Sequence, residues 1–121
     1  MGAFRVINTM TGQVLAERAG RATDFFGRLR GLIGRRRLEE GEGLHLVPCR
    51  AVHTFFMRIS IDAVFLDRDD GVLKTVGNIA PWRPRVTHPG TRSVLELPAG
   101  RLKRTGTLPG HRLAFERLEP R

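Results

Sequence analysis

Short runs rich in apolar and β-branched residues recur along the whole chain, separated by glycine, proline and acidic residues. Runs of this length and composition are typical of short β-strands. The sharpest turn signal is Asp70-Gly71, because an Asp-Gly pair suits the tight turn of a β-hairpin. The pattern predicts eight strands, at residues 4–8, 13–18, 44–47, 51–57, 61–67, 72–80, 91–97 and 112–118.

One segment, residues 23–34, has the spacing of a helix instead. Its apolar side chains would form a single stripe, made of Phe25, Phe26, Leu29, Leu32 and Ile33. Thr23 suits the N-cap position, and Gly34 suits the position after the last turn. We therefore expect a short helix over about residues 23–33. Residues 101–105 are expected to form one helical turn that ends at Gly106.

These elements predict a mostly β fold in a single domain, residues 1–121. The 121 residues are the size of one domain, and no linker-like segment divides them. Strands and helices do not alternate, which disfavours a doubly wound parallel sheet. A β-sandwich, a jelly-roll-like fold or a partly closed barrel fits best. Residues 81–90 contain three prolines and are expected to form an irregular loop.

Charge and cysteine content narrow the range of partners. The formal net charge is +9, and nearly all basic residues are arginine, which contacts phosphate and carboxylate groups in bidentate fashion. We expect weak binding to nucleic acid at low salt, independent of base sequence. Cys49 is the single cysteine, so an internal disulfide is excluded, and no apolar run could span a bilayer. We expect a cytoplasmic protein without a membrane partner, either a monomer or a weak dimer.

Three ionisable side chains on the predicted strands are candidates for chemistry. His53 is either a general acid or base near neutral pH, or a buried histidine that ties two strands together. Asp62 is either a base or ligand carboxylate, or a buried anchor for backbone N–H groups. Its apolar neighbours require a partner, for which we expect Arg30, with Arg58 and His53 as alternatives. Glu96 is the third candidate, with a solvent-facing side chain as the alternative.

Known catalytic and cofactor motifs are absent from the sequence. His53, Asp62 and Glu96 have the composition of a hard-cation or iron site, but no close ligand pair such as H-x-H accompanies them. Neither the glycine patterns of phosphate-binding loops and dinucleotide-binding turns nor the G-x-S-x-G nucleophile motif occurs. We therefore expect no bound metal and no cofactor.

A set of ordered motifs resembles one known family. The motifs are RGLIGR at residues 30–35, HTFFMRISIDAVFLD at 53–67 and ELPAG at 96–100. Their order and spacing are similar to those of the bacterial and archaeal family called domain of unknown function 192, over roughly residues 15–117. The resemblance implies a compact, largely β fold akin to a jelly roll, and no established activity. Two positions depart from the family pattern, because Ser60 stands where proline is usual and Ile33 where methionine is common.

Together these features predict a binding protein rather than an enzyme. Trp82 offers a large apolar face, and the flanking Arg83 and Arg85 can clamp an anion, although Trp82 could instead seal one end of the core. We expect a small anionic ligand, or an acidic segment of a protein partner, in a pocket formed by Arg30, His53, Thr54, Met57, Asp62 and Trp82. Two alternatives stay open: a metal-assisted or hydrolase-like enzyme that uses His53, Asp62 and Glu96, and a weak nucleic-acid-binding accessory protein.

Overall fold

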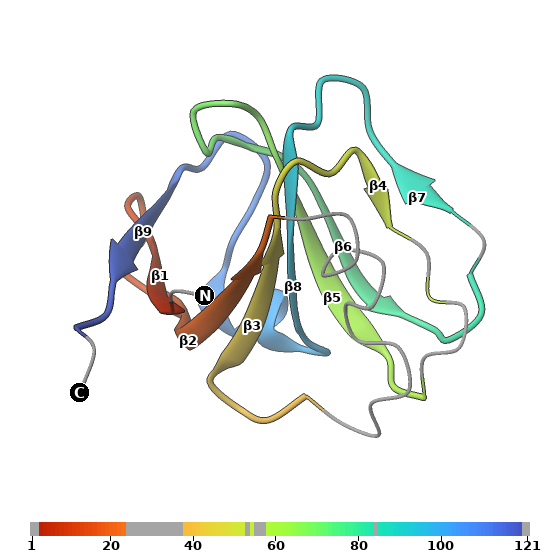
Figure 1. Ribbon diagram of the computed structural model, residues 1–121, viewed down its shortest axis with the longest axis horizontal. Coiled ribbons are helices and arrows are strands. Elements are labelled where there is room, and N and C mark those ends of the chain that lie inside the picture. Colours follow the sequence, from red (N-terminus) through yellow and green to blue (C-terminus); the bar gives the residue numbers. More distant parts are fainter. Residues whose placement is uncertain (1–2, 24–37, 53, 55–57, 84, 120–121) are drawn as a thin grey trace.

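The computed structural model describes residues 3–23, 38–52, 54, 58–83 and 85–119 (Figure 1). The helix expected at residues 23–33 lies outside this part of the chain, apart from Thr23. None of the described helices is long and apolar enough to cross a membrane.

Seven strands form one curled sheet in the order β6-β5-β8-β3-β2-β1-β9. Neighbouring strands are antiparallel except for the parallel pair β2 and β3. The strands are β1 (Ala3–Asn8), β2 (Val14–Ala22), β3 (Glu42–Leu46), β5 (Ile61–Leu66), β6 (Val72–Ile79), β8 (Ser93–Pro98) and β9 (Leu113–Arg117). A separate two-stranded sheet pairs β4 (Ala51–Val52) with β7 (Val86–Thr87). The prediction of a mostly β fold is confirmed.

The turn between β5 and β6 forms where the Asp-Gly signal predicts it. The Asp67 Oδ1 atom accepts hydrogen bonds from the backbone N–H groups of Asp69 and Gly71, each at 2.8 Å. Asp70 adopts a left-handed conformation with φ 62°, which aspartate tolerates better than most residues. This turn brings the start of β6 back along β5.

The two edges of the sheet meet at one end, so that the sheet forms a half-barrel. The Val72 N–H donates to the His111 carbonyl at 2.8 Å, and the Leu113 N–H donates to the Asp70 carbonyl at 3.0 Å. The chain before β9 therefore lies beside the start of β6, although β6 and β9 are opposite edges of the ladder. Among the three architectures expected from the sequence, the partly closed barrel is closest to this curled sheet.

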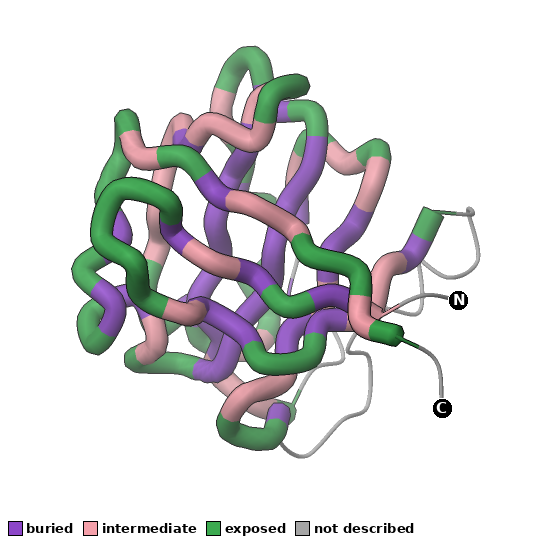
Figure 2. The backbone as a smooth tube through the Cα atoms, turned by 90° about the vertical axis from the view of Figure 1, so that its left-hand side faces the viewer, coloured by how far each residue is buried: buried purple, intermediate pink, exposed green. Residues whose placement is uncertain are grey.

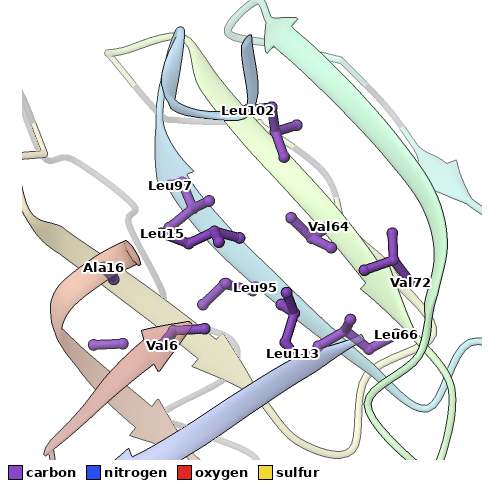
Figure 3. Close-up of a cluster of buried hydrophobic side chains, with 11 residues drawn as sticks. Val6, Leu15, Ala16, Val64, Leu66, Val72, Leu95, Leu97, Leu102 and Leu113 are labelled. Carbon is purple, nitrogen blue, oxygen red and sulfur yellow. The ribbon is translucent and has the colours of Figure 1, made fainter. Parts of the chain in front are cut away.

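Apolar side chains on the two faces of the sheet form separate clusters. The inner cluster fills the inside of the curl (Figure 3) and consists of Val6, Leu15, Ala16, Ala19, Val64, Leu66, Val72, Leu95, Leu97, Leu102 and Leu113. The outer cluster lies on the opposite face and includes Ala22, Leu38, Leu46, Val52, Ile61, Ala63, Phe65, Ile79, Val86 and Val94. Because both faces are covered, every residue of β5 and β8 is buried, while exposed residues concentrate in the turns (Figure 2).

The described helix, α2 (Arg101–Thr105), is the single turn that the sequence predicts. Gly106 ends it in a left-handed conformation with φ 65°, which glycine adopts without strain. Leu102 is buried and belongs to the inner cluster. The helix therefore covers one end of the half-barrel interior.

Two segments differ from the sequence-based prediction. Of the strand expected at 51–57, the structure describes residues 51, 52 and 54, and Ala51–Val52 form β4 of the small sheet. Thr54 leaves the strand because its backbone pairs with the loop at residues 82–83. The loop expected at 81–90 contains β7, which forms because β4 lies opposite it. Both differences arise from contacts between segments that are distant in sequence.

Candidate functional site

Asp62 is a buried anchor for two backbone amides. Its register partners show a bulge in β6 between the pairs Ile61–Ile79 and Ala63–Val76. The Asp62 carboxylate accepts hydrogen bonds from the N–H groups of Asn78 in this bulge and Leu102 in α2, each at 2.8 Å. This geometry fits the interpretation of Asp62 as a buried anchor. Its carboxylate accepts hydrogen bonds from backbone N–H groups that a strand bulge and a helix start leave without a backbone partner.

Among the described residues, the partners of the Asp62 carboxylate are backbone amides and not the side chains that the sequence predicts. The two hydrogen bonds that the described residues donate to the Asp62 carboxylate come from backbone amides, and Arg58 is exposed. Arg30 and His53 lie outside the described residues, so the Arg30–Asp62 pair stays a prediction.

Glu96 is buried on the outer face of the sheet. The alternative that its side chain faces solvent is therefore wrong. Its side chain is 3% exposed, and its cross-strand neighbours are Leu44 and Ala63. No hydrogen bond to its carboxyl group is present among the described residues. Burial raises the pKa of Glu96 to about 7.

Asp62 and Glu96 do not belong to one site. In the β5–β8 pair, Asp62 lies opposite Leu97 and Ala63 lies opposite Glu96. Directly opposed residues share a face, so the Asp62 carboxylate points to the inner face and the Glu96 carboxyl group to the outer face. The described part of the chain contains no group of three or more His, Cys, Asp or Glu residues that could hold a metal ion. His53, the third candidate, lies outside the described residues.

Thr54 and Trp82 meet at a clasp between two loops. The Thr54 hydroxyl donates to the Ala80 carbonyl at 2.7 Å and accepts from the Arg83 N–H at 2.7 Å. The Trp82 N–H donates to the Thr54 carbonyl at 2.8 Å. Thr54 is fully buried, so it holds the loop in place rather than facing a ligand. Trp82 is 58% exposed, so it does not seal the core. Met57, also expected in this pocket, lies outside the described residues.

A buried histidine cluster, which no sequence motif signals, lies on the inner face. The Arg21 Nε–H donates to His45 Nδ1 at 3.1 Å, which places the ring proton on Nε2, where it donates to Ser93 Oγ at 2.9 Å. Burial and the Arg21 charge lower the pKa of His45 to about 3. This tautomer cannot accept a proton from Ser93, so the pair is structural. The His45 ring also stacks on Phe115, with centroids 4.3 Å apart.

A groove of about 1000 Å³ opens where three loops meet, and we call it the arginine groove. Four exposed arginines line it: Arg50, Arg68, Arg85 and Arg92. The remaining lining residues are Pro48, Asp67, Asp69, Thr87, His88, Pro89, Gly90 and Thr91. The described residues form no ion pair with these four guanidinium groups, although two carboxylates line the same groove. The lining therefore carries a formal excess of two positive charges when His88 is neutral.

Backbone hydrogen bonds fix the loops that carry these arginines. The Thr87 hydroxyl donates to the Arg50 carbonyl at 2.6 Å, which joins β7 to the segment before β4. The Arg92 N–H donates to the Leu66 carbonyl, and the Cys49 N–H donates to the Arg92 carbonyl, both at 2.8 Å. All three segments are thus connected to the end of β5. The backbone under the groove is preorganised, while the guanidinium groups extend into solvent.

His88 adds an imidazole ring to the groove. Its Nδ1 lies 2.8 Å from the Pro89 carbonyl oxygen, which can only accept, so Nδ1 carries the proton. The other ring nitrogen, Nε2, is then an acceptor in the neutral ring. Thr91 fixes the His88 backbone through a 2.6 Å hydrogen bond from its hydroxyl to the His88 carbonyl.

Only part of this groove is predictable from the sequence. Arg85 is expected to clamp an anion because it flanks Trp82 together with Arg83. Arg50, Arg68 and Arg92 were missed, since they lie in three separate turns and form no local run. Only the pairing of β4 with β7 and of β5 with β8 brings them together.

Comparisons with known proteins agree with the motif resemblance. The model of a family described as "Uncharacterized ACR", domain of unknown function 192, matches residues 6–115. A "UPF0127 protein" from Thermococcus sibiricus is 32% identical over 100 residues. The match covers 78% of this chain and 64% of that protein, so this chain spans less than two thirds of its relative's length.

Two solved structures have the same fold. One is a "putative transcription regulator" from Sinorhizobium meliloti, with a TM-score of 0.82 and 24% identity over 94% of this chain and 92% of that chain. The other is a protein of unknown function from Novosphingobium aromaticivorans, with a TM-score of 0.80 and 25% identity over 93% of this chain and 83% of that chain.

Proposed function

We propose that this chain, which belongs to the uncharacterised family of domain of unknown function 192, binds a multiply charged anionic ligand in the arginine groove. The observation that carries the proposal is the convergence of Arg50, Arg68, Arg85 and Arg92 on one groove without ion-pair partners among the described residues. Like charges placed together on fixed loops repel one another, and a bound anion relieves that repulsion.

The chemistry of the lining favours a ligand with several oxyanion groups. Guanidinium groups bind phosphate and carboxylate oxygens in bidentate fashion. Four guanidinium groups surround a groove of about 1000 Å³, and a single small oxyanion is too small to contact all of them. The proposed site therefore differs from the pocket expected around Asp62, since Asp62 is buried and bound to backbone amides.

A catalytic function has less support. The hydrolase-like or metal-assisted alternative needs His53, Asp62 and Glu96 on one side of the sheet, and the two carboxyl groups point to opposite faces. Neither carboxyl group lines the arginine groove.

The proposal is tested by isothermal titration of the protein with inorganic tripolyphosphate. We expect binding that weakens between about 50 and 200 mM salt, because salt screens the attraction between the anion and the exposed arginines. A charge-assisted hydrogen bond contributes about 1.5–3 kcal/mol, so Arg50→Gln and Arg92→Gln should each weaken binding about tenfold or more.

The matched control is Arg5→Gln, which removes one exposed guanidinium on β1, away from the groove. If binding follows net charge alone, all three variants weaken it equally, and the proposal is wrong. Absence of binding at the lowest salt concentration also rejects it.

A further inference from the structure

Trp82 combines an exposed side chain with a left-handed backbone. The side chain is 58% exposed, although burying a large aromatic ring is favourable by a few kcal/mol. Its backbone has φ 68°, a left-handed conformation that is strained for a bulky residue. Strain of this kind persists where the surroundings enforce it, most often at binding and catalytic sites.

The clasp at Thr54 enforces the position of Trp82. Hydrogen bonds at 2.7–3.0 Å connect Thr54 to Trp82 and Arg83 through both backbone and hydroxyl groups. The structure thus presents an aromatic ring to solvent on a fixed backbone. A preorganised aromatic surface loses little conformational entropy when a flat ligand stacks on it.

Trp82 is close in sequence to the arginine groove. Arg85, which lines the groove, is three residues after Trp82, and three residues span at most about 11 Å. Arg83 lies between them and is exposed. This segment therefore carries an exposed tryptophan and two exposed arginines, of which Arg85 lines the groove.

From this arrangement we infer that the anionic ligand of the groove is a single-stranded nucleic acid. Its phosphates contact the groove arginines, and one base stacks on Trp82. Proteins that bind single strands without sequence preference combine a basic groove with aromatic stacking surfaces. A duplex hides the faces of its bases, and an acidic peptide gains nothing specific from the indole, so neither ligand accounts for Trp82. This inference rests on the proposed function and identifies its ligand class.

Two carboxylates in the groove limit the expected affinity. Asp67 and Asp69 line the groove and repel phosphate, although one Asp67 oxygen is engaged by the turn. We therefore expect moderate binding that depends strongly on salt and weakly on base identity.

The experiment uses the single tryptophan of the chain as its own reporter. Indole fluorescence is followed while the full chain is titrated with an oligo-dT strand, an oligo-rU strand, a DNA duplex and tripolyphosphate. We expect quenching by the single strands and no quenching by tripolyphosphate, which binds without a ring to stack. A difference between dT and rU tells whether DNA or RNA is the preferred strand.

Affinities of variants are measured by anisotropy of labelled oligo-dT, with tripolyphosphate affinity measured by calorimetry. Stacking contributes about 1–3 kcal/mol per base, so Trp82→Ala should lower oligonucleotide affinity about 5- to 150-fold and leave tripolyphosphate affinity unchanged. Trp82→Phe should restore part of the loss. The control is Leu108→Ala, which removes another exposed apolar side chain that does not line the groove.

The outcomes separate this inference from the proposed function. If tripolyphosphate binds but Trp82→Ala leaves oligonucleotide affinity unchanged, or the duplex binds as well as the single strands, the nucleic acid inference is wrong and anion binding stands. If neither tripolyphosphate nor any strand binds, the proposed function fails and this inference fails with it.

Discussion

Two buried carboxyl groups on neighbouring strands show how differently a protein interior can accommodate the same chemical group. Asp62 is stabilised by two backbone N–H groups, so its charge is compensated inside the fold. Glu96 lies among apolar side chains, and burial raises its pKa to about 7. Both residues looked like chemical candidates in the sequence, where the face that each side chain occupies cannot be read without the strand register.

Glu96→Gln should remove a pH dependence of stability. The folded-state pKa of about 7 lies above the ordinary value of 4.5, so the folded protein holds a proton that the unfolded chain releases. This contribution to stability is complete below pH 4.5 and is lost as pH rises to about 7. The difference corresponds to about 3 kcal/mol. Urea unfolding of both proteins from pH 4 to 8 measures it, and the variant should gain stability relative to the parent as pH rises.

Comparison of the two proteins isolates Glu96 from the other titrating groups. His45 acts in the opposite direction, because its lowered pKa means that stability is lost as pH falls below 6.5. That effect is present in both proteins and cancels in the difference. Parallel stability profiles for the parent and Glu96→Gln would contradict the account of Glu96.

At the scale of elements, local signals predicted local structure well. The Asp70-Gly71 hairpin, the opening β1–β2 hairpin and the single turn of α2 before Gly106 are all formed. Each depends on turn chemistry within a few residues. The lengths of β4 and β7 were not predictable in this way, because each strand exists only where the other pairs with it.

Thr54→Val tests whether the clasp stabilises the loop that carries Trp82. Valine keeps the shape of threonine but leaves the Ala80 carbonyl and the Arg83 N–H without their hydroxyl partner. The expected loss is about 1–3 kcal/mol of unfolding free energy, measured by urea denaturation. Thr75→Val on β6 is the control, since the described residues give the Thr75 hydroxyl no hydrogen bond. Equal stability of the two variants would show that the clasp contributes nothing.

At the scale of the whole molecule, the half-barrel is a support for loops. Its strands β5 and β8 are buried on both faces, and the arginine groove lies on the loops at one end of the half-barrel. Such loops commonly carry binding residues because a rigid sheet positions them. The net charge of +9 predicted an anionic partner in general, but the groove required segments from residues 48 to 92 to meet in space. Neither charge content nor periodicity contains that information.

The arginine groove is the proposed anion-binding site, and backbone amide chemical shifts locate a bound anion residue by residue. ¹⁵N-labelled protein is titrated with tripolyphosphate while each backbone amide is followed. We expect shifts concentrated at the amides of the groove lining, at residues 50, 67–69, 85, 87, 88 and 90–92. Shifts confined to the other basic surface, at Arg101, Lys103 and Arg104, or spread evenly over the exposed arginines, would contradict it.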